Sequence, residues 1–350
     1  MSRNPIRQPD KNRYLNAIRH IESEEIPYAE DEIEITLGRK ILGRDLPMVW
    51  MPSNLPVKDY VDLTIASGSD VIFLNNVWQL GRKNVFDSEG RQHYVDGTIK
   101  TREALKDVTY PDLDILKRRL DALIEGIDGT GLGIKFSPNP APFIVATAMG
   151  YQDYYMNLAV NPGFVHEFLE IAHDYCMREL EVALSYPIDV VEVGIIVWDK
   201  SGLMMSRQMM EEFELPALRD QVQFVKCRGL PVSFHADGRI FDSIPDLIKM
   251  GIDLITCLEP CDGTQDIYRI KELYGDKVAL QGNIDLSGVL VFGTPDEVRQ
   301  DVIEHIEKLA VGGGYICASS HDISQAVPIE NFYALRDTVL GYRFAGSPQQ

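Results

Sequence analysis

The 350-residue sequence has few cysteines, no long apolar run and a deficit of basic residues. It contains 34 lysines and arginines against 53 aspartates and glutamates, which gives a formal net charge of −19. Nucleic acids and anionic membranes attract patches of lysine and arginine, so this deficit argues against both as partners. No stretch reaches about 18 consecutive apolar residues, and we therefore expect no membrane span.

The N-terminus and the cysteines indicate a cytoplasmic protein. Residues 1–14 contain no apolar core of the kind that signal peptides have. The five cysteines form an odd and sparse set, which is typical of reduced thiols in the cytoplasm. Cys257 and Cys261 form a C-x3-C pair without further cysteines nearby, and we interpret both as structural.

What the sequence does contain is an alternation of short β-branched runs with helix-length amphipathic stretches. This alternation predicts an α/β fold, a (β/α)8 TIM barrel, with a doubly wound open sheet as the alternative. The clearest helix is 294–310, where Thr294 and Glu297 form a capping box around Pro295. The expected strands are 48–51, 71–75, 133–136, 190–196, 232–235, 254–258, 278–282 and 315–319.

The sequence predicts one domain overall, because no repeat and no long Pro/Gly/Ser linker divides it. Residues 1–46 are expected to form an N-terminal arm, with a helix at 12–23 and an acidic loop at 24–34. Residues 47–350 are expected to form the barrel.

Polar side chains follow six of the expected strands, at the barrel rim where βα loops carry catalysis. His235 and Asp237 are two positions apart and share a face of a regular strand. With Glu259 and His321 they predict a metal site of nitrogen and oxygen ligands, suited to zinc but also to iron or manganese. The alternative is that the two histidines only bind carboxylates through hydrogen bonds, and that Glu259 only caps the loop before Pro260.

Aromatic and methionine residues are frequent in the middle of the chain. Most are expected in the core, but those at the rim would suit a flat aromatic substrate or a corrin face. The candidate substrate-binding residues are Phe136, Tyr151, Trp198 and Met204, with Asn283 after the seventh expected strand.

The segment 231–331 resembles the uroporphyrinogen decarboxylase-like superfamily. The matching pieces are HADG at 235–238, GNID at 282–285, GTPDEV at 293–298, SHDI at 320–323 and PIEN at 328–331. Residues 12–27 and 202–206 are also similar. The resemblance implies a (β/α)8 barrel with one of two activities, which are cofactor-free decarboxylation and zinc- and corrinoid-dependent methyl transfer.

The decarboxylase branch is the less favoured of the two. Its members use an arginine-containing N-terminal segment and an aspartate after an early strand. At the matching positions this chain has Met-Pro-Ser-Asn at 51–54 and an asparagine, Asn76. The resemblance makes Asn76 a candidate catalytic residue, together with Glu192 or Asp199 from the fourth strand.

The members of the methyltransferase branch differ in the residues that bind zinc. Members that methylate a thiol carry His-x-Cys and a distant Cys, whereas this chain has Asp237 and His321 at those positions. Carboxylate and imidazole ligands leave zinc a stronger Lewis acid, which suits a methyl donor. The resemblance is closest to first methyltransferases of O-demethylases, whose Glu-x14-Glu-x20-His pattern matches Asp199, Glu214 and His235. The alternative for Glu214 is a solvated carboxylate on a helix.

These observations predict a zinc-dependent methyltransferase. It would move a methyl group from a small methoxylated compound, expected to be aromatic, to Co(I) of a corrinoid protein. The chain lacks an Asp-x-His-x-x-Gly segment, so cobalamin would be carried by that separate partner. The alternatives are a methyl-corrinoid:thiol methyltransferase, a decarboxylase, and a catalytically silent scaffold that binds the corrinoid protein. The sequence is compatible with a homodimer but does not require one.

Overall fold

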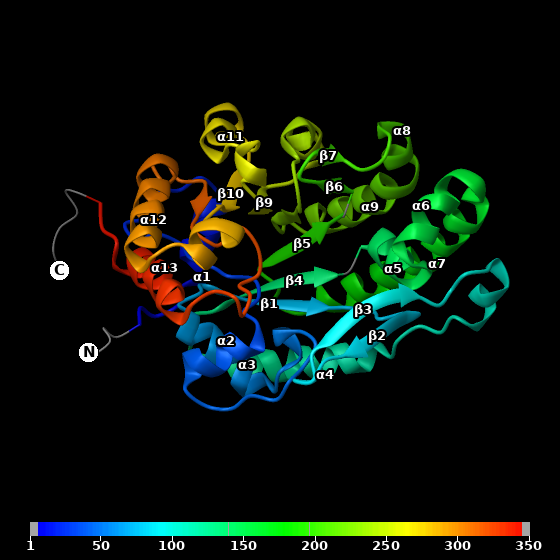
Figure 1. The fold of residues 1–350 in the computed structure, drawn as a ribbon, viewed down its shortest axis with the longest axis horizontal. Coiled ribbons are helices and arrows are strands. Elements are labelled where there is room, and N and C mark those ends of the chain that lie inside the picture. Colours follow the sequence, from blue (N-terminus) through cyan, green and yellow to red (C-terminus); the bar gives the residue numbers. More distant parts are fainter. Residues whose placement is uncertain (1–5, 139, 196, 345–350) are drawn as a thin grey trace.

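A curved parallel sheet forms the centre of the molecule (Figure 1). The computed structural model describes residues 6–138, 140–195 and 197–344, so Ile196, in one expected strand, lies outside the described residues. The sheet order is β1-β4-β5-β8-β9-β10-β11, so neighbours in space follow chain order, as in a TIM barrel. The strands are β1 (Val71–Asn76), β4 (Gly133–Pro138), β5 (Val190–Gly194), β8 (Val232–His235), β9 (Leu254–Leu258), β10 (Ala279–Gly282) and β11 (Tyr315–Ile316). The expected α/β TIM-barrel-like fold is confirmed.

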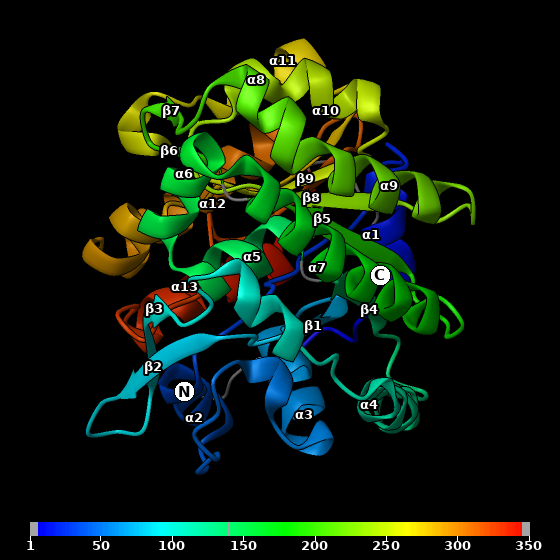
Figure 2. The ribbon, with the colours of Figure 1, turned by 90° about the vertical axis from the view of Figure 1, so that its right-hand side faces the viewer.

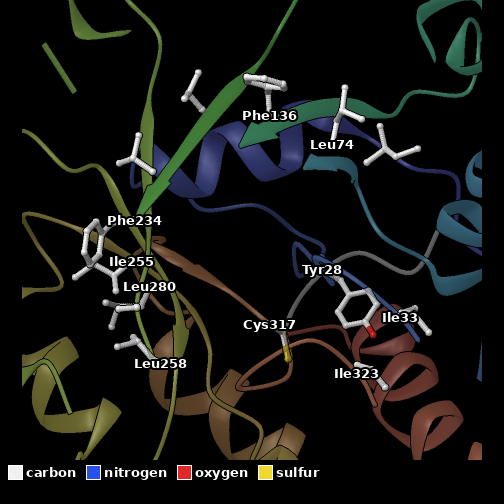
Figure 3. Close-up of a cluster of buried hydrophobic side chains, with 14 of the residues drawn as sticks. Tyr28, Ile33, Leu74, Phe136, Phe234, Ile255, Leu258, Leu280, Cys317 and Ile323 are labelled. Carbon is white, nitrogen blue, oxygen red and sulfur yellow. The ribbon is translucent and has the colours of Figure 1, made fainter. Parts of the chain in front are cut away.

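An N-terminal segment fills the gap between β11 and β1. Tyr28 forms a parallel bridge with Cys317, and Ile33 forms another with Ile323. Figure 3 shows these four side chains lying together. On the opposite side, the backbone oxygen of Tyr28 accepts a hydrogen bond of 2.8 Å from the amide of Asp70 at the start of β1. The segment therefore completes the wall of the barrel.

The expected strand at 48–51 is wrong. No strand occurs there; Pro47 and Pro52 flank the run, and proline has no amide hydrogen for a sheet. The place in the barrel wall between β11 and β1 is taken instead by part of the segment 24–34. This segment was expected to be an acidic loop ahead of the barrel.

Helices form a layer around the strands. In Figure 1 the strands β1, β4 and β5 point to the right, and Figure 2 shows the molecule from that side. The capping box at Thr294 and Glu297 is confirmed. Within the described ranges, none of the helices has the length and apolar character needed to cross a membrane. The helices are α1 (Lys11–Ile18), α2 (Ile35–Leu42), α3 (Val57–Ser67), α4 (Leu113–Ile127), α5 (Ala141–Met149), α6 (Tyr151–Val160), α7 (Pro162–Ala183), α8 (Arg207–Met209), α9 (Leu215–Lys226), α10 (Ile244–Met250), α11 (Ile267–Tyr274), α12 (Pro295–Leu309) and α13 (Ile329–Gly341). Short 3₁₀ turns are η1 (Pro52–Asn54), η2 (Arg102–Asp107), η4 (Phe241–Ser243) and η5 (Cys261–Gly263), and π turns are η3 (Met210–Glu214) and η6 (Leu286–Leu290).

Two hairpins extend the loops at the carboxyl ends of the strands. The first joins β2 (Arg82–Phe86) to β3 (Gln92–Gly97), and the second joins β6 (Trp198–Asp199) to β7 (Gly202–Leu203). Figure 1 shows the β2–β3 hairpin reaching beyond the end of β1. These hairpins flank the side of the barrel where catalytic residues are expected.

Alternation along the strands separates apolar from polar side chains. Leu74, Phe136 and Phe234 are almost fully buried in the main apolar cluster (Figure 3). Their neighbours Phe73 and Lys135 point to the opposite face, because successive side chains of a strand alternate. The interior of the barrel therefore receives several polar groups.

Candidate functional site

A cavity of about 220 Å³ lies at the carboxyl ends of the strands. Residues from β1, β4, β5 and β8 form half of its wall, and the N-terminal segment adds Asp31. The loop after β11 adds His321 and Asp322. The lining residues are Asp31, Phe73, Asn75, Ser137, Pro140, Phe143, Glu192, Val193, Gly194, Ile195, His235, Asp237, His321 and Asp322.

Two histidines and one aspartate meet at the wall of this cavity. His235 Nε2 lies 3.3 Å from Asp237 Oδ1, and His321 Nε2 lies 3.2 Å from the same oxygen. Each of the three residues offers a ligand atom within 4.8 Å of the other two. Two imidazoles and a carboxylate are a common donor set for a catalytic zinc ion.

The second ring nitrogen of His321 accepts a hydrogen bond. The backbone amide of Asp322 donates to His321 Nδ1 over 2.7 Å. An amide always donates, so Nδ1 carries no proton, and in the neutral ring the proton is on Nε2, facing Asp237. A metal bound at Nε2 would require the opposite tautomer, and the contact with the Asp322 amide would then have to change.

A second group of donor atoms lies deeper and shares His235. Asp31, His235 and Cys257 also offer ligand atoms within 4.8 Å of one another. Cys257 has a φ of 55°, in the left-handed region that few non-glycine residues adopt. Thr256 Oγ1 donates to Glu192, so the side chains of the adjacent residues Thr256 and Cys257 both point into the barrel. In a regular strand, adjacent side chains point to opposite faces.

A buried lysine joins two carboxylates beneath the histidines. Lys135 Nζ is 2.7 Å from Asp31 Oδ1 and also forms an ion pair with Glu192 Oε2. Ser233 and Thr256 donate to the same Glu192 oxygen over 3.2 and 3.0 Å. Glu192 Oε1 lies 3.7 Å from His235 Nδ1, so this network sets the orientation of the imidazole.

The charges of the site shift its pKa values. Burial raises the pKa of Asp237, but His235 and His321 outweigh burial and hold that pKa well below its usual range. Burial lowers the pKa of His235, but Cys257 and Asp237 raise it well above its ordinary value. Asp237 is therefore a carboxylate throughout the physiological range, ready to bind a cation.

The structure does not bring two other expected metal ligands to these groups. Glu259 accepts a hydrogen bond of 2.9 Å from the amide of Gly238 and caps that loop. Glu214 lies in the π turn η3, buried, where Tyr154 donates to it over 2.6 Å. Burial raises the pKa of Glu214 to about 7, so it is not the solvated carboxylate of the alternative interpretation.

Of the three candidate catalytic residues, only Glu192 lines the cavity. The Asn76 amide donates to Glu179 on α7, while its neighbour Asn75 faces the cavity. Asp199 is exposed and accepts hydrogen bonds of 2.7 Å from the amide and the hydroxyl of Ser201. Asp199 therefore stabilises the β6–β7 hairpin, and the pattern with Glu214 and His235 is not assembled around one point.

None of the five candidate substrate-binding residues is part of the described cavity wall. Phe136 is fully buried and Trp198 packs edge-on against the core residue Phe234, with ring centroids 6.1 Å apart. Asn283 donates to the backbone oxygen of Leu258 over 2.6 Å. Met204 is exposed, and Tyr151 lies in a neighbouring small cavity with Glu214. Of the cavity wall's aromatic residues, Phe143 also lines that second cavity.

Comparison with known proteins places the chain in a family. A model described as Uroporphyrinogen decarboxylase (URO-D) matches residues 98–342, more than half of the chain. The chain belongs to the URO-D family. The expected resemblance is thereby confirmed.

Curated members of the URO-D family are similar at low identity. The uroporphyrinogen decarboxylase of Azoarcus sp. (strain BH72) is 25% identical over 287 residues, covering 77% of this chain and 75% of that protein. That of Herminiimonas arsenicoxydans is 26% identical over 290 residues, covering 77% and 76%. A solved structure, a methyltransferase from Methanosarcina mazei, is 16% identical, covers 94% of this chain and 97% of its own, and has a TM-score of 0.74. This likeness shows a shared fold.

Two residues of the cavity wall, Asp31 and Asn75, and two residues that contact or adjoin the site, Lys135 and Cys257, were missed from the sequence. Asp31 and Asn75 lie ahead of the segment that matches the URO-D family model. Lys135 offered a signal, because a lysine inside the apolar run of β4 needs a buried partner. Cys257 offered none, because its inward position depends on its unusual backbone conformation.

Proposed function

We propose that this protein is a metal-dependent methyltransferase that takes the methyl group of a small methoxylated aromatic compound. The observation that carries the proposal is the convergence of His235, Asp237 and His321 on one wall of a small cavity. Phe73 and Phe143 supply apolar surface to the same cavity, which suits a single aromatic ring.

The donor set fits a zinc ion. His235, Asp237 and His321 would hold it, with Asp31 and Cys257 as the deeper alternative around the same His235. Zinc would supply Lewis acidity, which draws electron density from an ether oxygen as its methyl group leaves. Glu192 Oε1 favours a proton on His235 Nδ1 and so presents Nε2 toward Asp237.

The other cavity residues position the substrate. Phe73, Pro140 and Phe143 would cover its ring and exclude water from the reacting ether. Asn75 and Ser137 place polar side chains at the ends of β1 and β4, where a ring substituent is within reach of the cavity wall. Holding the methyl group in line with its acceptor accounts for much of the expected rate enhancement.

The acceptor in this proposal is the corrinoid of a separate protein. The chain carries no Asp-x-His-x-x-Gly segment, so cobalamin would arrive with its partner. The cavity lies at the carboxyl ends of the strands, which is where the partner would have to approach.

Decarboxylation of a uroporphyrinogen remains the alternative, because the curated relatives carry that name. Two observations speak against it. Four carboxylates, Asp31, Glu192, Asp237 and Asp322, line the cavity, and the described part of its lining contains no lysine or arginine. Such a wall offers no lysine or arginine to pair with the many carboxylates of that substrate. A cavity of about 220 Å³ is also below the usual range for drug-sized ligands, and a tetrapyrrole is larger still.

A single-turnover assay tests the proposal. Zinc-supplemented protein, a photoreduced corrinoid protein and a panel of methoxylated aromatics are mixed, and the visible spectrum is followed for conversion of Co(I) to methyl-Co(III). We expect protein-dependent methylation that His235→Ala abolishes and the exposed control His166→Ala retains. No methylation from any donor would overturn the proposal, and methyl transfer to coenzyme M or CO2 release from uroporphyrinogen would identify the alternatives.

A further inference from the structure

Arg82, the first residue of the β2–β3 hairpin, lies in a box of aromatic rings. Its guanidinium carbon is 4.8 Å from the ring centre of Trp50, 5.1 Å from that of Tyr94 and 5.8 Å from that of Phe143. Nε and Nη1 are buried and have no hydrogen-bond partner, and no ion pair of Arg82 is found within the described residues.

An arginine without a carboxylate partner is unexpected in this chain, which has 53 acidic residues against 34 basic ones. On the same hairpin, Arg91 pairs with Asp87 over 2.7 Å. Cation–π contacts stabilise a guanidinium, but they leave its N–H groups unsatisfied, and buried donors without partners cost free energy. A planar guanidinium is suited to bind a carboxylate through two parallel hydrogen bonds.

The aromatic box adjoins the cavity. Phe143 belongs to both the box and the cavity wall. Tyr151 packs edge-on against Tyr94, with ring centroids 5.8 Å apart. The pKa of Tyr151 is raised by burial, lowered by Arg82 and raised by Asp237, so this hydroxyl lies within electrostatic reach of both charges. Phe143 and Tyr151 line the same small neighbouring cavity, so the aromatic box around Arg82 continues toward the cavity that contains Asp237.

We propose that Arg82 binds the carboxylate of an aromatic acid whose methoxy group reaches the cavity beside Asp237. This inference rests on the proposed function and adds the substrate class: a methoxylated aromatic carboxylate instead of a neutral ether. One guanidinium beside the cavity accepts one anionic group. The acidic cavity wall then forces the carboxylate to the Arg82 end and the ether to the end near Asp237.

The test measures binding, not turnover. Benzoate and its neutral analogue benzamide are titrated calorimetrically into zinc-supplemented, full-length protein. Arg82→Gln is compared with Lys83→Gln, which removes the same charge from an exposed neighbour on the same strand. Arg82→Lys keeps the charge but loses the planar guanidinium with its two parallel donors. It replaces Arg82→Gln in the test if Arg82→Gln does not fold.

We expect Arg82→Gln to weaken benzoate binding by at least about tenfold and Arg82→Lys to weaken it less, because the carboxylate loses a charged, two-point partner. Lys83→Gln should leave benzoate binding unchanged, and benzamide should bind every variant alike. The inference is overturned if wild-type protein does not bind benzoate, if Arg82→Gln binds it normally, or if benzamide binding falls equally.

This outcome is separable from the proposed reaction, because benzoate carries no methyl group. Arg82-dependent binding of benzoate without methyl transfer from any donor would retain the anion site and overturn the methyltransferase. Methyl transfer together with equal binding of benzoate and benzamide would retain the methyltransferase and overturn the anion site.

Discussion

The rings of His235 and His321 stand 5.7 Å apart at an interplanar angle of 85°, with both Nε2 atoms directed at one oxygen of Asp237. A single carboxylate oxygen thus faces two imidazoles that come from distant parts of the chain. Two imidazoles that converge on one carboxylate oxygen at a cavity wall are an arrangement suited to hold a metal ion. This arrangement underlies the first prediction.

Replacing Asp237 with asparagine keeps the shape of the side chain and removes its charge. We expect the affinity for Zn²⁺ to fall by at least about tenfold, because a neutral amide is a poor zinc ligand and two imidazoles remain alone. Competition with a chromophoric chelator measures the affinity. The control Asp199→Asn should bind zinc normally. Equal losses in both variants would favour the Asp199, Glu214 and His235 ligand set instead.

Replacing Lys135 with methionine leaves two buried carboxylates, Asp31 and Glu192, without their cation. We expect unfolding free energy to fall by about 3–5 kcal/mol, as is typical when one partner of a buried ion pair is removed. Urea denaturation at pH 7 measures the loss. Lys58→Met, which breaks an exposed pair with Asp62, should cost less than about 1 kcal/mol. A similarly small loss for Lys135→Met would contradict a stabilising role of the buried network.

Glu179 on α7 makes stability depend on pH. It is fully buried, and burial raises its pKa from an ordinary value of 4.5 to about 8. The folded state therefore holds a proton that the unfolded state releases, and stability falls as pH rises from about 4.5 to about 8. Glu179→Gln removes this dependence while keeping an acceptor for Asn76.

We expect Glu179→Gln to be more stable than the wild type by about 1–3 kcal/mol at pH 9 and nearly equal to it at pH 5. Thermal unfolding at the two pH values measures the difference. The exposed neighbour Glu181→Gln should show no such pH-dependent gain. If Glu179→Gln loses stability at pH 9, Glu179 is not a buried neutral acid.

Asp70, just before β1, holds the N-terminal segment in the barrel wall. Its carboxylate pairs with Arg13 and accepts hydrogen bonds from the amides of Asp10, at 3.1 Å, and Tyr28, at 3.2 Å. We expect Asp70→Asn to cost about 2–4 kcal/mol, because Arg13 loses a buried partner. Limited proteolysis should then cut the chain ahead of residue 34, whereas the half-buried control variant Asp62→Asn stays protected. Unchanged protection of Asp70→Asn would show that the segment is held by its other contacts.

The sequence was most informative where the relevant pattern is local. Apolar runs followed by polar residues predicted β1, β4, β8 and β9 and placed His235, Asp237 and His321 at one rim. The capping box at Thr294 also depends only on residues a few positions apart. In these cases the local secondary-structure propensity of the residues and the tertiary structure favour the same strand or helix.

Prediction failed where a side chain depends on register or on distant pairing. Asn75 and Asn76 differ by one position, yet one faces the cavity and the other faces α7. Asp31 reaches the site because a short polar segment pairs with strands far away in sequence. Cys257 turns inward through a left-handed backbone that residue type alone does not reveal.

The pairing of the N-terminal segment with the last strand has a consequence for synthesis. Glu30 accepts a hydrogen bond from the amide of Ser319, 289 positions later in the chain. During translation the segment leaves the ribosome well before its partners, which are made 289 positions later. A nascent chain therefore carries Asp31 for most of its synthesis without a cavity to line. The site comes into existence only when residues 28–33 meet residues 317–323, so a polypeptide that lacks either segment cannot form the complete pocket.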